Sequence, residues 1–204
     1  MIEAALEHLR RGGVVAAATE SFFGLLADAT RTDAVDVLVR LKPRGAEKGI
    51  PLLLPSREAW EKWVVALPEV ARRLGAAFWP GPLTVALPAR SGLDPRTLLD
   101  GRVAVRLPGP SAAAELAARF ERPLTATSAN FPGLPPALTD AQVRRTFSSV
   151  LPDHLIVLPG RAPGGVPSTV VVVEDDAYRV VRPGAVSEAR IRAVAGVDPS
   201  DPNR

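Results

Sequence analysis

Three cations stand close together in a short polar segment that begins at Lys42. Pro43 disfavours a helical conformation for Lys42, so Lys42 and Arg44 can project to the same side of an extended chain. Lys48 follows four residues later, and Glu47 is the only acid among these cations. Such a cluster suits a triphosphate, because each hydrogen bond between charged groups contributes roughly 1.5–3 kcal/mol. The ordinary solubility of a surface loop is the alternative explanation of the same spacing.

A hydroxyl and an amide follow directly on a short buried strand that we expect at residues 124–127. Ser128 and Asn130 repeat the spacing of two residues, and their side chains can fix polar atoms of a substrate. Ligands of open α/β sheets bind at the carboxyl ends of strands, where this pair stands. A turn that simply ends the strand is the structural alternative.

Arginines flank two further predicted strands. Arg102 and Arg106 lie on either side of an apolar segment, and Arg106 needs a carboxylate partner or a ligand within it. Arg182 precedes Pro183 and Gly184 in a turn-like sequence that leaves its guanidinium free to reach an anion. A structural ion pair is the alternative for Arg106.

Two loops beside predicted strands complete the candidate set. The segment 19–24 follows an apolar run, and Gly24 would let its backbone approach a ligand closely. Its adjacent Phe22 and Phe23 are more often core residues than a surface on which adenine stacks. Ser168 precedes the valine-rich run 170–173.

The composition excludes several kinds of chemistry. The chain has no cysteine, which rules out disulfides, thiolate metal sites and thiol nucleophiles. His8 and His154 are the only histidines and offer no catalytic triad. We predict no protein-held metal, and the known P-loop and dinucleotide fingerprints are absent, so bound phosphate needs another arrangement.

Length and composition place the chain among ordinary globular proteins. Its 204 residues suit one α/β domain, and 47% apolar and 23% charged residues are near the globular average. A net charge of +3 is a weak signal, so we expect at most weak RNA binding. The amphipathic N-terminus and the lack of a run of ~20 apolar residues predict a cytoplasmic protein without a membrane partner.

Alternating helices and short strands must position these side chains. We expect helices at residues 2–11, 32–41, 56–66, 69–78, 111–120 and 187–194, with Thr32 as an N-cap and a further helix that begins with a capping box of Thr139 and Gln142. Strands are expected at 14–18, 51–54, 83–87, 103–107, 124–127, 154–158, 169–173 and 179–181. This order predicts an α/β (α+β) fold, with one domain over residues 1–197 on a twisted mixed sheet and a frayed tail at 198–204.

In their order along the chain, seven short motifs resemble the YrdC-like threonylcarbamoyl-AMP synthase family. They are Thr19–Leu25, Lys42–Arg44, Trp79–Thr84, Ala104–Arg106, Ser128–Asn130, Ser168–Val170 and Arg182–Gly184. The resemblance spans about residues 12–185, and seven matches in register are far more specific than any single one. It implies the YrdC-like fold, in which flanking helices surround a concave basic cavity.

The family's reaction joins L-threonine, bicarbonate and ATP into threonylcarbamoyl-AMP and releases pyrophosphate. The resemblance therefore implies ATP as a substrate, accompanied by Mg²⁺, and downstream proteins that transfer the threonylcarbamoyl group to adenosine 37 of tRNA. No side-chain nucleophile is needed, since the threonine amine attacks bicarbonate and the carbamate then attacks the α-phosphorus. Positioning and electrostatic stabilisation would supply the catalysis.

The same resemblance implies roles residue by residue. The catalytic set would be Lys42, Arg44, Ser128 and Asn130. ATP would contact Arg44, Lys48, Arg102, Ser128, Asn130 and Arg182. L-Threonine would contact Ser21, Arg106 and Ser168.

The sequence also departs from the family pattern. Ala18 stands where proline is usual, Ser21 where threonine is common and Phe23 where tyrosine is common. The chain resembles the short form of the family, which needs partner proteins for the transfer step. Two alternatives stay open: a non-catalytic RNA- or nucleotide-binding paralogue, and a carbamoyl-adenylate-forming module like that of hydrogenase maturation factors.

Overall fold

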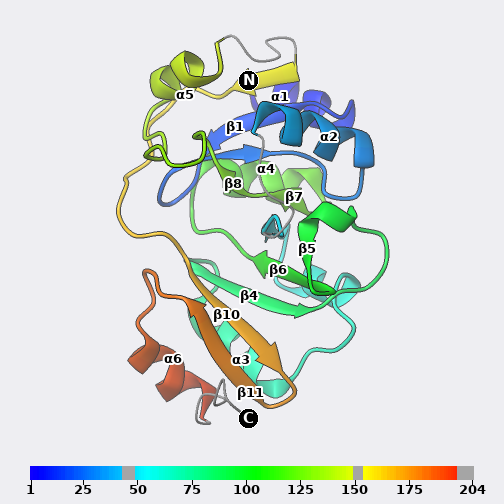
Figure 1. Ribbon diagram of the computed structural model, residues 1–204, viewed down its shortest axis with the longest axis vertical. Coiled ribbons are helices and arrows are strands. Elements are labelled where there is room, and N and C mark those ends of the chain that lie inside the picture. Colours follow the sequence, from blue (N-terminus) through cyan, green and yellow to red (C-terminus); the bar gives the residue numbers. More distant parts are fainter. Residues whose placement is uncertain (43–48, 149–153, 197–204) are drawn as a thin grey trace.

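Two mixed β-sheets with helices on their outer faces make up the structure, a computed structural model that describes residues 1–42, 49–148 and 154–196. Figure 1 shows the smaller sheet beside the N-terminus and the larger one beside the end of the described chain. The expected α/β class with mixed sheets and flanking helices is confirmed, although the strands are distributed over two sheets. The predicted tail at 198–204 lies outside the described residues.

The smaller sheet has the order β8-β2-β1-β9. Its strands are β1 (Val14–Ala18), β2 (Phe23–Leu26), β8 (Thr127–Ser128) and β9 (Leu155–Val157). Val14 and Ala16 pack towards α2 (Thr32–Leu41) and α5 (Asp140–Phe147), whereas Val15 and Ala17 pack towards α1 (Ile2–Arg10) and α4 (Ala112–Phe120). Burial on both faces explains why β1 reads as a continuous apolar run.

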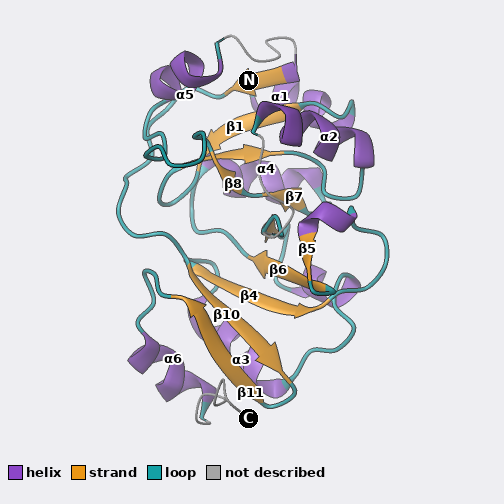
Figure 2. Cartoon of the chain, viewed as in Figure 1, coloured by secondary structure: helices purple, strands orange, loops and turns teal. Residues whose placement is uncertain are grey.

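The larger sheet has the order β11-β10-β4-β6-β3-β7, and β5 pairs with β6. Its strands are β3 (Leu52–Leu53), β4 (Leu83–Pro88), β5 (Leu98–Leu99), β6 (Arg102–Arg106), β7 (Leu124–Thr125), β10 (Thr169–Glu174) and β11 (Ala177–Arg182). One face packs on α3 (Glu69–Phe78) and α6 (Glu188–Ala195), which contact each other. In Figure 2, α3 lies behind β10 and β11, and α6 lies to their left. Because successive side chains along a strand point to opposite faces, every second residue of these strands points to the face that α3 and α6 do not cover.

Amphipathic spacing predicted several helices well. The bounds of α2 and α3 match the expectation, and Thr139 and Gln142 form the capping box of α5. Thr32, however, is the first residue of α2; its N-cap is Arg31, which makes no side-chain cap hydrogen bond. In place of the helix expected at residues 56–66, the structure has a short 3₁₀ segment, Glu58–Lys62. Another 3₁₀ segment, Pro95–Thr97, lies later in the chain.

The strand expected at residues 124–127 is two strands that belong to different sheets. β7 pairs with β3 in the larger sheet, and β8 pairs with β2 in the smaller one. Ala126 lies between them and donates its backbone N–H to the carbonyl of Pro51 (2.7 Å). The chain therefore crosses from one sheet to the other just before Ser128.

None of the described helices is long and apolar enough to cross a bilayer.

Candidate active site

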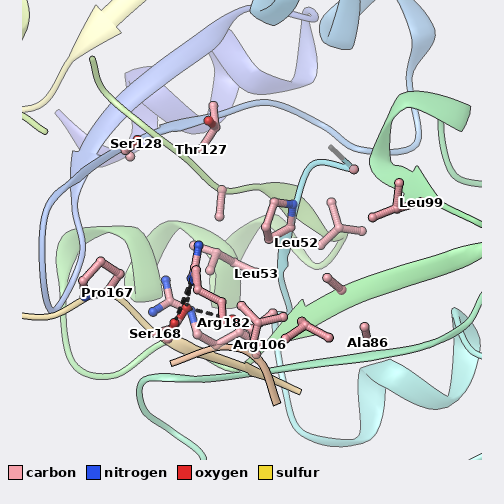
Figure 3. A pocket seen from close by; sticks show the side chains of 18 of the residues that line it. Leu52, Leu53, Ala86, Leu99, Arg106, Thr127, Ser128, Pro167, Ser168 and Arg182 are labelled. Carbon is pink, nitrogen blue, oxygen red and sulfur yellow. Dashed lines mark hydrogen bonds between the residues drawn. The ribbon is translucent and has the colours of Figure 1, made fainter. Parts of the chain in front are cut away.

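A cavity of about 860 Å³ is lined by residues of both sheets. Its floor comes from the face of β4, β6, β10 and β11 that the helices leave open, and its far wall comes from β8 and the loop that joins β1 to β2. Figure 3 shows this arrangement, with Ser128 on the wall and Arg106, Ser168 and Arg182 near the floor. The volume falls in the usual range of ligand sites.

Rows of side chains cross the floor from strand to strand. The first row contains Thr84, Val170 and Arg182, and Arg106 at the end of β6 continues it. The second row contains Ala104, Ala86, Val172 and Arg179. Arg102 and Glu174 lie beyond the second row. Cations thus stand at both ends of a floor whose middle is apolar.

An irregularity in β11 aims Arg182 into the cavity. Val171 pairs with Val180 and Val170 pairs with Arg182, so one extra residue, Val181, is inserted between these two pairs. Cross-strand partners share a face of the sheet, and Val170 lines the cavity. Regular alternation would have turned Arg182 away, because Arg179 also lines the cavity.

Arg106 is buried and paired with a carboxylate. Its side chain is 9% exposed, and its Nη1 donates to Oε1 of Glu20, whose side chain is 17% exposed. Burial lowers the pKa of Arg106 from its ordinary value, and the charge of Glu20 opposes that shift. The sequence left a carboxylate or a ligand as the partner of Arg106, and the structure supplies a carboxylate.

Ser168 links Arg182 to a buried threonine. Arg182 donates from Nη2 to the Ser168 carbonyl oxygen (2.8 Å) and to Ser168 Oγ (2.9 Å), and from Nε to the same carbonyl (3.2 Å). Ser168 Oγ also lies 2.9 Å from Oγ1 of Thr84. Burial lowers the pKa of Arg182, and the nearby charge of Arg106 lowers it further. Glu20 pairs with Arg106 and is the only carboxylate paired with either arginine among the described residues, so this end of the cavity carries an excess of positive charge.

Lys42 approaches the cavity from the opposite wall. Its Nζ donates to the carbonyl oxygen of Ser128 (2.6 Å), to Ser128 Oγ (3.1 Å) and to Oδ1 of Asn130 (2.9 Å). Ser128 Oγ donates in turn to Asn130 Oδ1 (2.5 Å). The structure therefore brings three predicted catalytic residues together. Lys42 and Ser128 line the cavity, and Asn130 contacts the ammonium of Lys42.

The loop between β1 and β2 is fixed by its own threonine. Thr19 Oγ1 donates to the carbonyl of Phe22 (2.8 Å) and accepts from the backbone N–H of Ser21 (3.2 Å). This turn places Ser21 and Phe22 along the cavity. Phe23 is fully buried in the core between β2 and the helices, as the core interpretation predicted.

The remaining predicted residues lie apart from these clusters. Arg102 lines the far end of the floor, where its guanidinium pairs with Glu174. Arg44 and Lys48 lie outside the described residues. Sequence reasoning named no role for Glu20 or Thr84, although both stand inside quoted motifs. Their contacts join residues 86 and 84 positions apart, which local patterns cannot show.

A family model covering the Sua5, YciO and YrdC proteins, described as "Telomere recombination", matches residues 7–184. The chain belongs to this family. The resemblance that the seven motifs carried is therefore confirmed. Each of the seven motifs contributes at least one described residue to the lining of the cavity.

Members of the Sua5/YciO/YrdC family with curated names resemble the chain over nearly all its length. The threonylcarbamoyl-AMP synthase of Pyrococcus abyssi is 34% identical over 197 residues, which are 96% of this chain and 57% of that protein. The putative threonylcarbamoyl-AMP synthase of Mycobacterium tuberculosis strain H37Rv is 35% identical over 199 residues, with 97% and 90% covered. This chain thus spans a little over half of the first relative and most of the second.

Solved structures of the family have the same fold. The crystal structure of P. abyssi Sua5 complexed with L-threonine matches with a TM-score of 0.86 at 32% identity, covering 96% of this chain and 57% of that one. Escherichia coli YciO matches with a TM-score of 0.80 at 23% identity, covering 93% and 92%. The likeness to YciO shows the fold alone.

Proposed function

We propose that this protein is an L-threonylcarbamoyladenylate synthase, which makes threonylcarbamoyl-AMP and pyrophosphate from L-threonine, bicarbonate and ATP. The observation that carries the proposal is the pair of polar clusters in one cavity: Lys42 with Ser128 and Asn130 on one wall, and Arg106 with Arg182 and Ser168 at the floor. The names of the Pyrococcus and Mycobacterium relatives support the same reaction.

ATP is proposed to place its phosphates against the Lys42 cluster. Three oxygen acceptors hold the ammonium of Lys42 beside the cavity, so its charge is already positioned when a phosphate arrives. These contacts use its three N–H donors, so a phosphate oxygen that bonds to it directly would replace one of them. Arg44 and Lys48 follow Lys42 in the sequence and remain proposed phosphate contacts, as does Arg102 at the far end of the floor. Cations at these positions would stabilise the charge that develops on the pyrophosphate leaving group.

L-Threonine is proposed to place its carboxylate near Arg106 and Ser168. The site carries more positive than negative charge, since Glu20 is the only carboxylate paired with Arg106 or Arg182 among the described residues. A guanidinium suits a carboxylate because it presents parallel N–H donors. Ser21 is a further proposed threonine contact on the opposite wall. Arg182, which the resemblance assigns to ATP, contacts Ser168, a proposed threonine residue.

The proposed chemistry needs positioning more than a reactive side chain. The threonine amine attacks the carbon of bicarbonate, water leaves, and a carbamate forms. A carbamate oxygen then attacks the α-phosphorus, and the bond to the β-phosphate oxygen breaks to release pyrophosphate. Holding the carboxylate at one cluster and the phosphates at the other would set the attacking oxygen beside the α-phosphorus.

Magnesium is proposed to enter with ATP as part of the substrate. The described residues contain no group of three or more His, Asp or Glu side chains that would hold a metal ion. Mg²⁺ is commonly bound through substrate phosphates with one or two carboxylates, so the cavity is compatible with MgATP.

We also propose that residues 1–197 form one domain and that the protein acts in the cytoplasm. Its product would pass to the proteins that transfer the threonylcarbamoyl group to tRNA. Direct RNA binding is proposed to be weak at most, given the small net charge.

Pyrophosphate release by the purified protein tests the proposal. ATP and bicarbonate are supplied with L-threonine, with L-serine or with no amino acid, and threonine-dependent release is expected. Lys42→Met should lower the rate at least a hundredfold, whereas Lys62→Met, a matched change at an exposed lysine, should not. ATP binding without release would favour a nucleotide-binding paralogue, and release that requires carbamoyl phosphate would favour a carbamoyl-adenylate-forming module.

A further inference from the structure

Thr84 is a buried hydroxyl at the floor of the cavity that no assignment so far explains. It belongs to β4, is 2% exposed, and its Oγ1 lies 2.9 Å from Ser168 Oγ. It pairs across the sheet with Val170, two residues after Ser168. The hydroxyl is therefore built into the same rigid row that carries Arg182.

The hydrogen-bonding capacity of Ser168 limits how these groups can be arranged. A serine hydroxyl has two lone pairs and one hydrogen. Arg182 Nη2 donates to Ser168 Oγ (2.9 Å) and therefore uses one lone pair. The contact with Thr84 must use either the second lone pair or the hydrogen of Ser168.

Burial of Thr84 favours one of these two directions. Among the described residues, Ser168 Oγ is the acceptor within hydrogen-bond distance of Thr84 Oγ1. If Ser168 donated to Thr84, the hydrogen of Thr84 would have no acceptor among the described residues, which is costly for a residue that is only 2% exposed. Donation from Thr84 to Ser168 avoids this cost and leaves the hydrogen of Ser168 to point elsewhere.

The backbone around the pair prevents an easy rearrangement. Thr169 donates its N–H to the carbonyl of Pro82 (3.0 Å), so the segments that carry Ser168 and Thr84 are joined directly. Gly184 packs against the same segment, because a Cβ at Gly184 would lie 2.4 Å from the carbonyl oxygen of Pro167. The oxygen of Ser168 is thus fixed beside the cavity that it lines.

We propose that Thr84 is a positioning residue that makes Ser168 a hydrogen-bond donor to the carboxylate of the amino-acid substrate. By accepting from both Thr84 and Arg182, Ser168 Oγ turns its hydrogen towards the cavity. The hydroxyl then acts together with the positive charges of Arg106 and Arg182 on one carboxylate. This inference rests on the proposed function. It adds that Thr84 orients the Ser168 hydroxyl in the proposed amino-acid site.

Calorimetric titration with L-threonine tests the role of Thr84. Thr84→Val keeps the shape of the side chain and removes its hydroxyl, and it should weaken threonine binding about tenfold, the worth of one hydrogen bond. Thr84→Ser should restore wild-type affinity. In the reaction, the apparent KM for threonine should rise about tenfold in Thr84→Val while kcat and the KM for ATP change less than twofold.

Two comparisons separate this role from a general loss of stability. Thr125→Val removes another buried threonine hydroxyl, one that accepts from the N–H of Ala27 (2.8 Å), and it should lower the Tm without changing threonine affinity. In a Ser168→Ala background, Thr84→Val should have no further effect on threonine binding, because Thr84 acts through Ser168.

L-Threoninol, which lacks the carboxylate, identifies the group that is recognised. It should bind wild type and Thr84→Val equally weakly. Equal threonine affinity in wild type and Thr84→Val, or an equal loss for threonine and threoninol, would overturn the inference and leave the synthase proposal standing. A wild-type protein that neither binds threonine nor releases pyrophosphate would overturn both.

Discussion

Arg106 donates a hydrogen bond to Glu20, a residue 86 positions earlier in the chain. The pair joins the end of β6 in the larger sheet to the loop that follows β1 in the smaller sheet. Both side chains are largely removed from solvent, at 9% and 17% exposed. One ion pair thus connects the two sheets at the end of the cavity that also holds Arg182. We expect it to affect both the stability of the protein and ligand binding.

Replacing Glu20 by Gln should destabilise the protein by about 3 kcal/mol, because a buried guanidinium loses its counter-charge. The loss should appear in urea denaturation as a lower midpoint with an unchanged m-value. Glu174→Gln is the matched control, since Glu174 pairs with Arg102 but is 63% exposed, and it should cost less than about 1 kcal/mol. L-Threonine should restore more stability to Glu20→Gln than to wild type if its carboxylate replaces the lost charge. Equal costs for the two variants would contradict the structural role of the pair.

Gly184→Ala should disturb the site through the backbone. A Cβ at this position would lie 2.4 Å from the Pro167 carbonyl oxygen and 2.5 Å from the Ser168 carbonyl carbon, so β11 and the segment before β10 would have to separate. A loss of about 2–3 kcal/mol is expected, together with weaker threonine binding. Gly101→Asn is the control, because that glycine has a positive φ of 72° that asparagine tolerates and no atom within 4 Å of the added Cβ. Thermal melts that show the same stability for both variants would refute this reading of the contact.

Much of the scaffold follows from local patterns. The apolar stripes of α2 and α3 and the capping box of α5 are local, and the sequence predicted them. β2 was missed because Phe23–Leu26 contains Gly24 and does not alternate, being buried on both faces. Residues 124–127 read as one strand because the hydrogen bond from Ala126 to Pro51 is a long-range contact.

In the site, too, local sequence patterns could not predict contacts between residues that are far apart in the chain. Motif order predicted that Lys42, Ser128 and Asn130 act together, and the structure places them within hydrogen-bond distance. It could not predict that an extra residue in β11 turns Arg182 towards Ser168, since a bulge is visible only once the partner strand is known.

Asn130→Asp should weaken ATP binding by changing the charge beside Lys42. The new carboxylate would stand at the position from which Asn130 Oδ1 now accepts from Lys42 Nζ (2.9 Å), and it would neutralise the cation that the phosphates meet. A tenfold or larger loss of ATP affinity is expected at low salt and a smaller loss at high salt. Asn130→Ala is the control, because it removes the contact without adding charge and should cost less. ATP affinities that fall equally in both variants at every salt concentration would argue against an electrostatic role for the cluster.

Asp94 should make stability depend on pH in the acid range. Burial raises the pKa of this carboxyl, but hydrogen bonds from the Arg96 side chain and backbone outweigh it, so the pKa lies below its ordinary value. A carboxyl with a lowered pKa stabilises the fold above its unfolded pKa of about 3.9, and the contribution is lost as pH falls through the lower, folded value.

Asp94→Asn should therefore cost about 2 kcal/mol at pH 7, the worth of a hydrogen bond to a charged group. The difference from wild type should stay constant down to about pH 5 and shrink below about pH 4. Urea denaturation between pH 3 and pH 8 measures it. Asp33→Asn provides the comparison, because Asp33 also pairs with an arginine but is 63% exposed, and its effect should be much smaller throughout. A difference for Asp94→Asn that grows on acidification would mean that the sign of this shift is wrong.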